Sequence, residues 1–177
     1  VHASLSKFVD ALRSSVGVSG SYTNSTLSRY QQGELFPWDT DAYQCQMNVD
    51  SKVASWLNLN GKLNYLTTWY DDGRNEERNS RHLASFMGIY VIPVPEFFFS
   101  LSGEYSWNKT EGTDADRCFF LDAKVNYKSK LWEWEIVWQN LLNKDVYENV
   151  SFGNLSSTSI SFPLRKSNIV ASMRFNF

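Results

Sequence analysis

The feature that most constrains the fold is an alternation of apolar and polar residues that returns in segment after segment. In residues 57–65, Leu57, Leu59 and Leu63 alternate with asparagines and a lysine. A period of two places successive side chains on opposite faces of a β-strand. Further segments with this pattern lie at 16–23, 43–50, 83–92, 97–107, 119–127, 132–139 and 169–177. The chain is therefore expected to be all-β, with about eight long antiparallel strands.

Charged residues of these segments fall in one phase of the alternation. The apolar phase contains no Asp, Glu, Lys, Arg, Asn or Gln. A cation that faces the midplane of a bilayer costs roughly 2 to 4 kcal/mol, so contact with lipid would select such an exclusion. A soluble β-sandwich also keeps one face apolar. The charged residues expected to face a barrel lumen are Asp50, Lys62, Glu104, Asp122, Lys124, Glu133, Glu135 and Arg174.

The lengths of strands and connections favour the membrane. The expected strands run about ten residues, as tilted transmembrane strands do, whereas soluble strands average about 5 to 6. Short turns near Ser51, Pro95 and Ser129 alternate with long polar segments. Because antiparallel strands reverse direction each time, all short turns should lie at one rim and all long loops at the other.

This asymmetry predicts an antiparallel transmembrane β-barrel over residues 13–177. Residues 1–12, with apolar positions at helical spacing, are expected to be the end of a preceding element and a periplasmic turn. The long extracellular loops are expected at residues 24–41, 71–81, 109–116 and 143–163.

Aromatic residues make up 16% of the chain, and many stand in the apolar phase near the strand ends. Two belts of Trp and Tyr at the two membrane interfaces would account for this excess. In the soluble alternative the same rings would fill a core. The residues expected at the lipid interfaces are Tyr65, Tyr105, Trp107, Tyr127, Trp132, Trp134 and Trp138.

Several function classes are not supported by the sequence. With a net charge of −2, the chain lacks the excess of basic residues that nucleic-acid binding needs. No apolar run is long enough for a transmembrane helix. The histidines, His2 and His82, have no serine and aspartate in evident register, so no catalysis, cofactor or metal site is expected. Cys45 and Cys118 fall in opposite phases of separate strands and are expected to be unpaired.

The last nine residues form an alternating strand that ends on a phenylalanine. This segment resembles the terminal signal that the barrel-insertion machinery of Gram-negative outer membranes reads. The resemblance assigns the role of assembly signal to Ile169, Ala171, Met173, Phe175 and Phe177.

A wider resemblance lies in the segments before that strand. Asn140-Leu141-Leu142-Asn143-Lys144, and Arg165-Lys166-Ser167-Asn168 before the terminal strand, resemble the C-terminal end of TonB-dependent outer-membrane receptors of the Bacteroidetes type. Such receptors have about 22 strands, a plug and a TonB-contacting segment. The resemblance implies that these residues are the C-terminal part of a transporter wall in the cell outer membrane, which imports a nutrient or metal chelate.

The same resemblance implies several partners. They are outer-membrane lipid, the barrel-insertion machinery, the remainder of a larger barrel or its plug, the TonB system and a surface lipoprotein. The alternative is a self-contained outer-membrane barrel of eight strands, with side chains filling its interior and a structural or adhesion role.

Overall fold

The computed structural model describes residues 1–10, 13–31, 33–71, 77–152 and 157–175. These residues form eleven β-strands. The strands are β1 His2–Val9, β2 Ser14–Gln31, β3 Glu34–Ala54, β4 Leu57–Asp71, β5 Glu77–Val94, β6 Phe97–Thr110, β7 Asp116–Lys128, β8 Trp132–Gln139, β9 Val146–Phe152, β10 Ser157–Pro163 and β11 Asn168–Phe175. Within this part of the chain, no helix has the length and hydropathy needed to cross a membrane.

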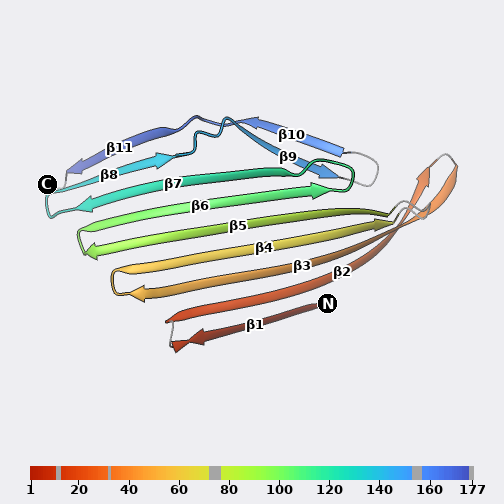
Figure 1. Ribbon diagram of the computed structural model, residues 1–177, viewed down its shortest axis with the longest axis horizontal. Helices are drawn as coiled ribbons and strands as arrows, with labels where there is room; N and C mark the ends of the chain where they lie inside the picture. The colour runs from red at the N-terminus through yellow and green to blue at the C-terminus, as the bar shows by residue number, and fades with distance from the viewer. Residues whose placement is uncertain (11–12, 32, 72–76, 153–156, 176–177) are drawn as a thin grey trace.

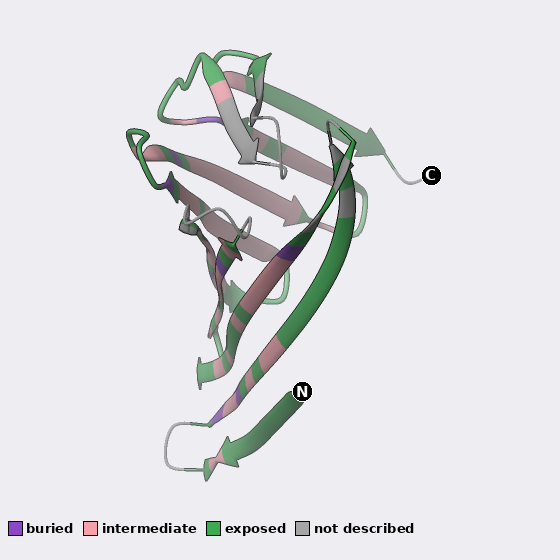
Figure 2. Ribbon diagram, turned by 90° about the vertical axis from the view of Figure 1, so that its right-hand side faces the viewer, coloured by how far each residue is buried: buried purple, intermediate pink, exposed green. Residues whose placement is uncertain are grey.

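Nine of the strands form one antiparallel sheet in the order β1-β2-β3-β4-β5-β6-β7-β8-β11 (Figure 1). Strands β9 and β10 form a separate two-stranded sheet. The large sheet curves along its width, as Figure 2 shows. It is open, with β1 and β11 at its edges. The expected all-β antiparallel fold is confirmed, whereas closure into a barrel is not observed among these strands.

The strand register divides the large sheet into two chemically distinct faces. Between β3 and β4, Cys45 pairs with Tyr65 and Met47 with Leu63, whereas Asn48, in the other phase, pairs with Lys62. The same phase continues across the sheet to β11. A slip of one residue would move a whole strand to the other face. We call the two sides the apolar face and the polar face.

The apolar face has little protein cover. Among the described residues, the only buried apolar side chains are Trp38 and Cys118. Met87, Ile169 and Met173, in contrast, are at least 60% exposed. Large contiguous apolar surfaces are rare on monomeric soluble proteins. The described strands therefore do not form a sandwich in which this face becomes a core.

The connections at the two rims differ, as Figure 1 shows. At one rim, two residues join β3 to β4, two join β5 to β6, and three join β7 to β8. At the opposite rim the β2–β3 hairpin projects, and the chain between β8 and β11 carries β9 and β10. We call these the short-turn rim and the loop rim.

The prediction of a loop at residues 24–41 was wrong. Strand β2 continues to Gln31 and β3 begins at Glu34, with Gly33 at a positive φ of 90° in the turn between them. Polar residues follow one another at 24–26, so no apolar phase marks the strand there. The backbone ladder needs no such phase and continues from Asn24 paired with Asp41 to the turn.

Other predicted boundaries also shift toward strand. Residues 143–163 contain β9 and β10, and residues 1–12 contain β1, which pairs with β2 over its whole length. An isolated helical turn of this length is unstable, whereas an edge strand gains ladder hydrogen bonds. Of the predicted loop at 71–81, residues 77–81 belong to β5. The predicted loop at 109–116 is confirmed for residues 111–115, which join β6 to β7. Part of the first segment, residues 72–76, lies outside the described residues.

The longer strands add charged residues to the apolar phase, among them the acids Asp39, Asp41, Asp71 and Glu77 at the loop rim. Lys7 stands on edge strand β1, and Arg81, Lys109 and Arg117 stand at the loop rim. Both cysteines are free, as predicted, with Cys45 exposed and Cys118 buried. They lie on opposite faces, since Cys45 pairs with Tyr65 and Cys118 pairs with Ser106.

Candidate functional site

The polar face carries a cavity of about 590 Å³ over β3 to β7. The side chains of the polar phase that line it combine amides, opposite charges and aromatic rings. They include Gln46, Asn48, Lys62, Asn64, His82, Phe86, Glu104 and Phe120, and Tyr147 also lines the cavity.

Tyr147 reaches this cavity from outside the large sheet. It lies on β9, and its ring centroid is 6.2 Å from that of Phe120 on β7. Tyr147 was missed because its segment was expected to be a loop. Phe86 and Phe120 were also missed as site residues. The signal for Phe120 was present, because it alternates in phase with Asp122 and Lys124.

A second cavity, of about 730 Å³, lies nearer the short-turn rim. Lys62 and Phe86 line both cavities, so the two form one trough along the polar face. Asp50 and Asn60 line the second cavity, and the Asn60 amide donates a hydrogen bond to the Asp50 carboxylate. We call the two cavities together the polar trough.

The register places all eight predicted charged residues on the polar face. Asp50, Lys62 and Glu104 line the trough, so the structure brings these three together. Asp122 also belongs to this phase and accepts a hydrogen bond, at 2.7 Å, from the backbone N–H of Asn140.

The remaining four charged residues lie away from the trough. Lys124 on β7 and Glu135 on β8 form an ion pair whose side chains are 40% and 34% exposed. Exposed pairs of this kind contribute roughly 0 to 1 kcal/mol. Glu133 accepts a hydrogen bond from the Asn126 amide at 3.1 Å and stands opposite Arg174 on β11. These residues line the polar face without forming a binding cluster.

Asn140 holds the segment that carries Tyr147. Its side-chain Nδ2 donates to the carbonyls of Lys144 at 2.8 Å and Arg165 at 2.9 Å, and its Oδ1 accepts from the Lys144 N–H at 2.9 Å. The residue is 9% exposed and has a φ of 52°, which asparagine tolerates better than most residues. We call this the Asn140 clasp, because it joins both ends of the segment between β8 and β11.

The trough contains groups that can bind a solute. The ring nitrogen Nδ1 of His82 is hydrogen-bonded to the Asn108 side chain. In the described ranges, no group of three or more His, Cys, Asp or Glu residues could hold a metal ion. Amides and single charges beside aromatic rings can hydrogen-bond a polar solute and stack against it.

The seven aromatic residues predicted at the lipid interfaces all belong to the apolar phase. At the short-turn rim, the ring centroid of Tyr127 is 5.8 Å from that of Trp134 and 6.4 Å from that of Trp132. Tyr65 and Trp107 belong to the end of the band nearer the loop rim, each paired with Leu83 on β5. The rings therefore stand toward both ends of the apolar face.

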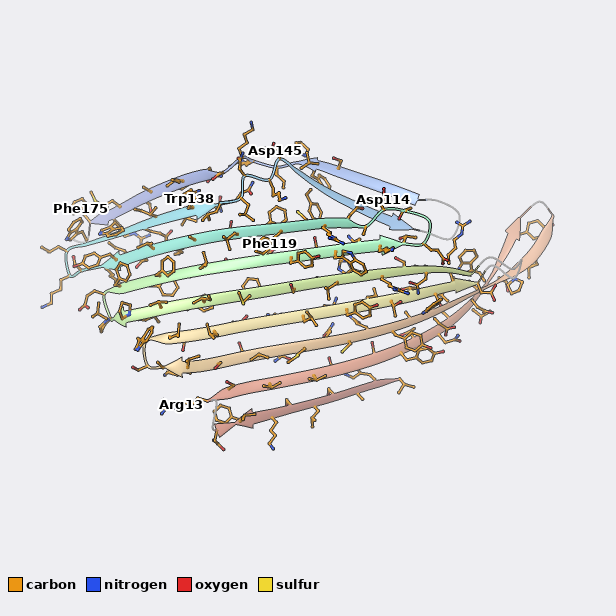
Figure 3. All side chains as sticks on the ribbon, in the orientation of Figure 1. Arg13, Asp114, Phe119, Trp138, Asp145 and Phe175 are labelled. Atoms are coloured by element: carbon orange, nitrogen blue, oxygen red, sulfur yellow. The ribbon has the colours of Figure 1, made fainter. Side chains whose placement is uncertain are left out.

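The terminal strand contributes to the same face. In the register of β11 with β8, Ile169 stands opposite Trp138, Ala171 opposite Ile136, and Met173 opposite Trp134. Figure 3 labels Phe175 at the short-turn rim and Trp138 farther along the sheet. Phe177, the last residue of the predicted assembly signal, lies outside the described residues.

The chain was compared with protein-family models, curated proteins and solved structures. None of the three comparisons finds a match, so neither family nor function follows from similarity.

Proposed function

We propose that this chain is part of the wall of a large outer-membrane β-barrel, and that the barrel imports a nutrient or metal chelate with the TonB system. The observation that carries the proposal is the apolar face. It extends across the large sheet from β2 to β11, is exposed or partly exposed, and has aromatic residues toward both ends. Lipid covers such a band in outer-membrane barrels, whose aromatic girdles lie at the two interfaces.

Strand parity favours a large barrel over a self-contained small one. Nine strands alternate in direction, so β1 and β11 run the same way. Direct pairing of these edges would make a parallel pair, whereas bacterial outer-membrane barrels are antiparallel with an even number of strands. Unpaired edges at membrane depth are not viable, because lipid cannot hydrogen-bond their backbone groups. Further strands are therefore needed to complete the wall.

The transport role is supported by the polar face and by the resemblance at the C-terminal end. In a closed barrel the polar trough would face the lumen, where its amides and charges meet a solute or a plug. A barrel of about 22 strands encloses a plugged lumen, whereas eight strands leave room only for side chains. The importer rather than the channel is favoured by the likeness of the Asn140-Leu141-Leu142-Asn143-Lys144 region to TonB-dependent receptors.

An intact-mass measurement tests this proposal. The polypeptide that contains this sequence should be extracted from native outer membranes and weighed by mass spectrometry. We expect a single chain several times heavier than the 20.4 kDa of these residues. A mature chain of 20.4 kDa without partner chains would contradict the importer and favour the small structural barrel.

A further inference from the structure

Three cations from consecutive strands gather on the apolar face at the loop rim. Arg81 of β5 stands directly opposite Lys109 of β6, and Arg117 of β7 stands opposite Trp107. Lys109 and Arg117 are thus diagonal neighbours. Directly opposite residues have Cβ atoms about 4.5 to 5.5 Å apart, and diagonal neighbours lie about 7 to 8 Å apart. The three side chains can therefore reach one ligand, and we call them the cationic patch.

The patch directly adjoins the apolar band. Arg81 is two residues from Leu83, Lys109 is two from Trp107, and Arg117 is two from Phe119, so each pair shares a face. Leu83 and Trp107 are also cross-strand partners. All three cations are exposed, and Phe119 is 41% exposed. On each of the three strands, the cation is therefore the next residue on the same face after an apolar side chain.

Acidic residues also stand at this rim, among them Glu77 of β5, which pairs with Asp71 of β4. Within the described part of the chain, none of the three cations forms an ion pair. Arg81 donates from Nε to the Asn79 side chain at 2.8 Å, which leaves its terminal NH₂ groups available. Of the two acids in the following connection, Glu111 accepts a hydrogen bond from the Asn79 N–H, while Asp114 is exposed at the loop rim (Figure 3).

We propose that the cationic patch binds the phosphate groups of anionic lipid headgroups while the acyl chains lie on the apolar face below it. The inference rests on the proposed membrane location. Arg and Lys are the side chains that recognise phosphate, and basic clusters beside an apolar surface attract anionic lipid. The neighbouring end of the same face carries Asp39, Asp41 and Asp71 on β3 and β4 and Glu77 at the start of β5, so the site runs from Arg81 of β5 to Arg117 of β7.

The test uses the full-length protein purified in detergent and titrated with a bisphosphorylated glycolipid in mixed micelles. Each cation near an anionic surface strengthens binding about fivefold, so the triple variant Arg81→Gln, Lys109→Gln, Arg117→Gln should bind on the order of a hundredfold more weakly. The control is Lys128→Gln, Lys130→Gln, Arg174→Gln, which removes the same charge elsewhere. It should bind within about twofold of the wild type, as expected for charges outside the ligand's contacts.

Two further arms identify the phosphate source and separate this inference from the proposed function. Inorganic phosphate, titrated alone, should not reproduce the binding; saturation equal to that of the glycolipid would overturn the lipid assignment. Tryptophan quenching by brominated lipid is measured on the same samples. If brominated lipid quenches the tryptophans but the triple variant binds the glycolipid as tightly as the wild type, the headgroup site is refuted and the membrane location stands. If brominated lipid does not quench the tryptophans of the wild type, the membrane location itself is refuted.

Discussion

Met87→Arg should lower the stability of the barrel in a bilayer by about 2 to 4 kcal/mol, which is the cost of a cation at the lipid midplane. Met87 occupies the middle of the apolar phase of β5 and is 61% exposed. Its cross-strand neighbours, Gly61 and Gly103, leave space for a longer side chain. A steric clash is therefore not the source of the expected loss.

The same substitution has a different consequence if water covers the face. Exposed surface substitutions usually change stability by no more than about 0.5 kcal/mol. The folded fraction in phospholipid vesicles, followed by urea titration, measures the difference. Asn60→Arg is the matched control, because Asn60 lies on the polar face beside Asp50 and opposite Gly88 of β5. The control should unfold like the wild type, and equal midpoints for Met87→Arg and Asn60→Arg would contradict lipid contact.

Asn140→Ala should destabilise the protein by about 3 kcal/mol. The change removes three side-chain hydrogen bonds of the Asn140 clasp and leaves the backbone groups of Lys144 and Arg165 without those partners. Each unsatisfied buried group costs roughly 1 to 3 kcal/mol, and alanine at a positive φ adds about 1 to 2 kcal/mol. Lys144 and Arg165 are exposed, so water replaces much of the lost hydrogen bonding and reduces the expected destabilisation to about 3 kcal/mol.

Asn140→Gly separates the two causes. Glycine adopts the positive φ of 52° without strain, so the loss that remains in this variant measures the hydrogen bonds. Urea unfolding provides the free energies, and limited proteolysis between residues 144 and 168 reports release of the segment that carries Tyr147. Both variants should be cleaved faster than the wild type. Unchanged cleavage in both would mean that the clasp does not hold the segment.

The division of the sheet into two faces could be predicted from the sequence because apolar and polar residues alternate within each strand. Leu59, Leu63 and Tyr65 identify the apolar face of β4 without reference to any other strand. Register then follows, since a slip would place asparagines among leucines. The charged residues of the polar face, from Asp50 to Arg174, were found in this way.

Features without a local period could not be predicted in the same way. Strands β2 and β3 extend through polar residues such as Asn24 and Thr26, where only backbone pairing defines the strand. Arg81 and Lys109 fell in segments expected to be loops, so the cationic patch was not predicted from the sequence. Tyr147 reaches the trough through a tertiary contact with Phe120, which no spacing in the chain encodes. Barrel closure likewise depends on how edge strands pair.

Fluorescence quenching by brominated lipid tests the central claim, contact between lipid and the apolar face, most directly. Of the seven tryptophans, a variant that keeps only Trp134 reports from the apolar band. A variant that keeps only Trp38, which is 8% exposed and stands opposite Leu27 beyond the band, serves as the reference. In vesicles of brominated phospholipid, Trp134 should be strongly quenched and Trp38 should not. Equal and negligible quenching of both would contradict the account.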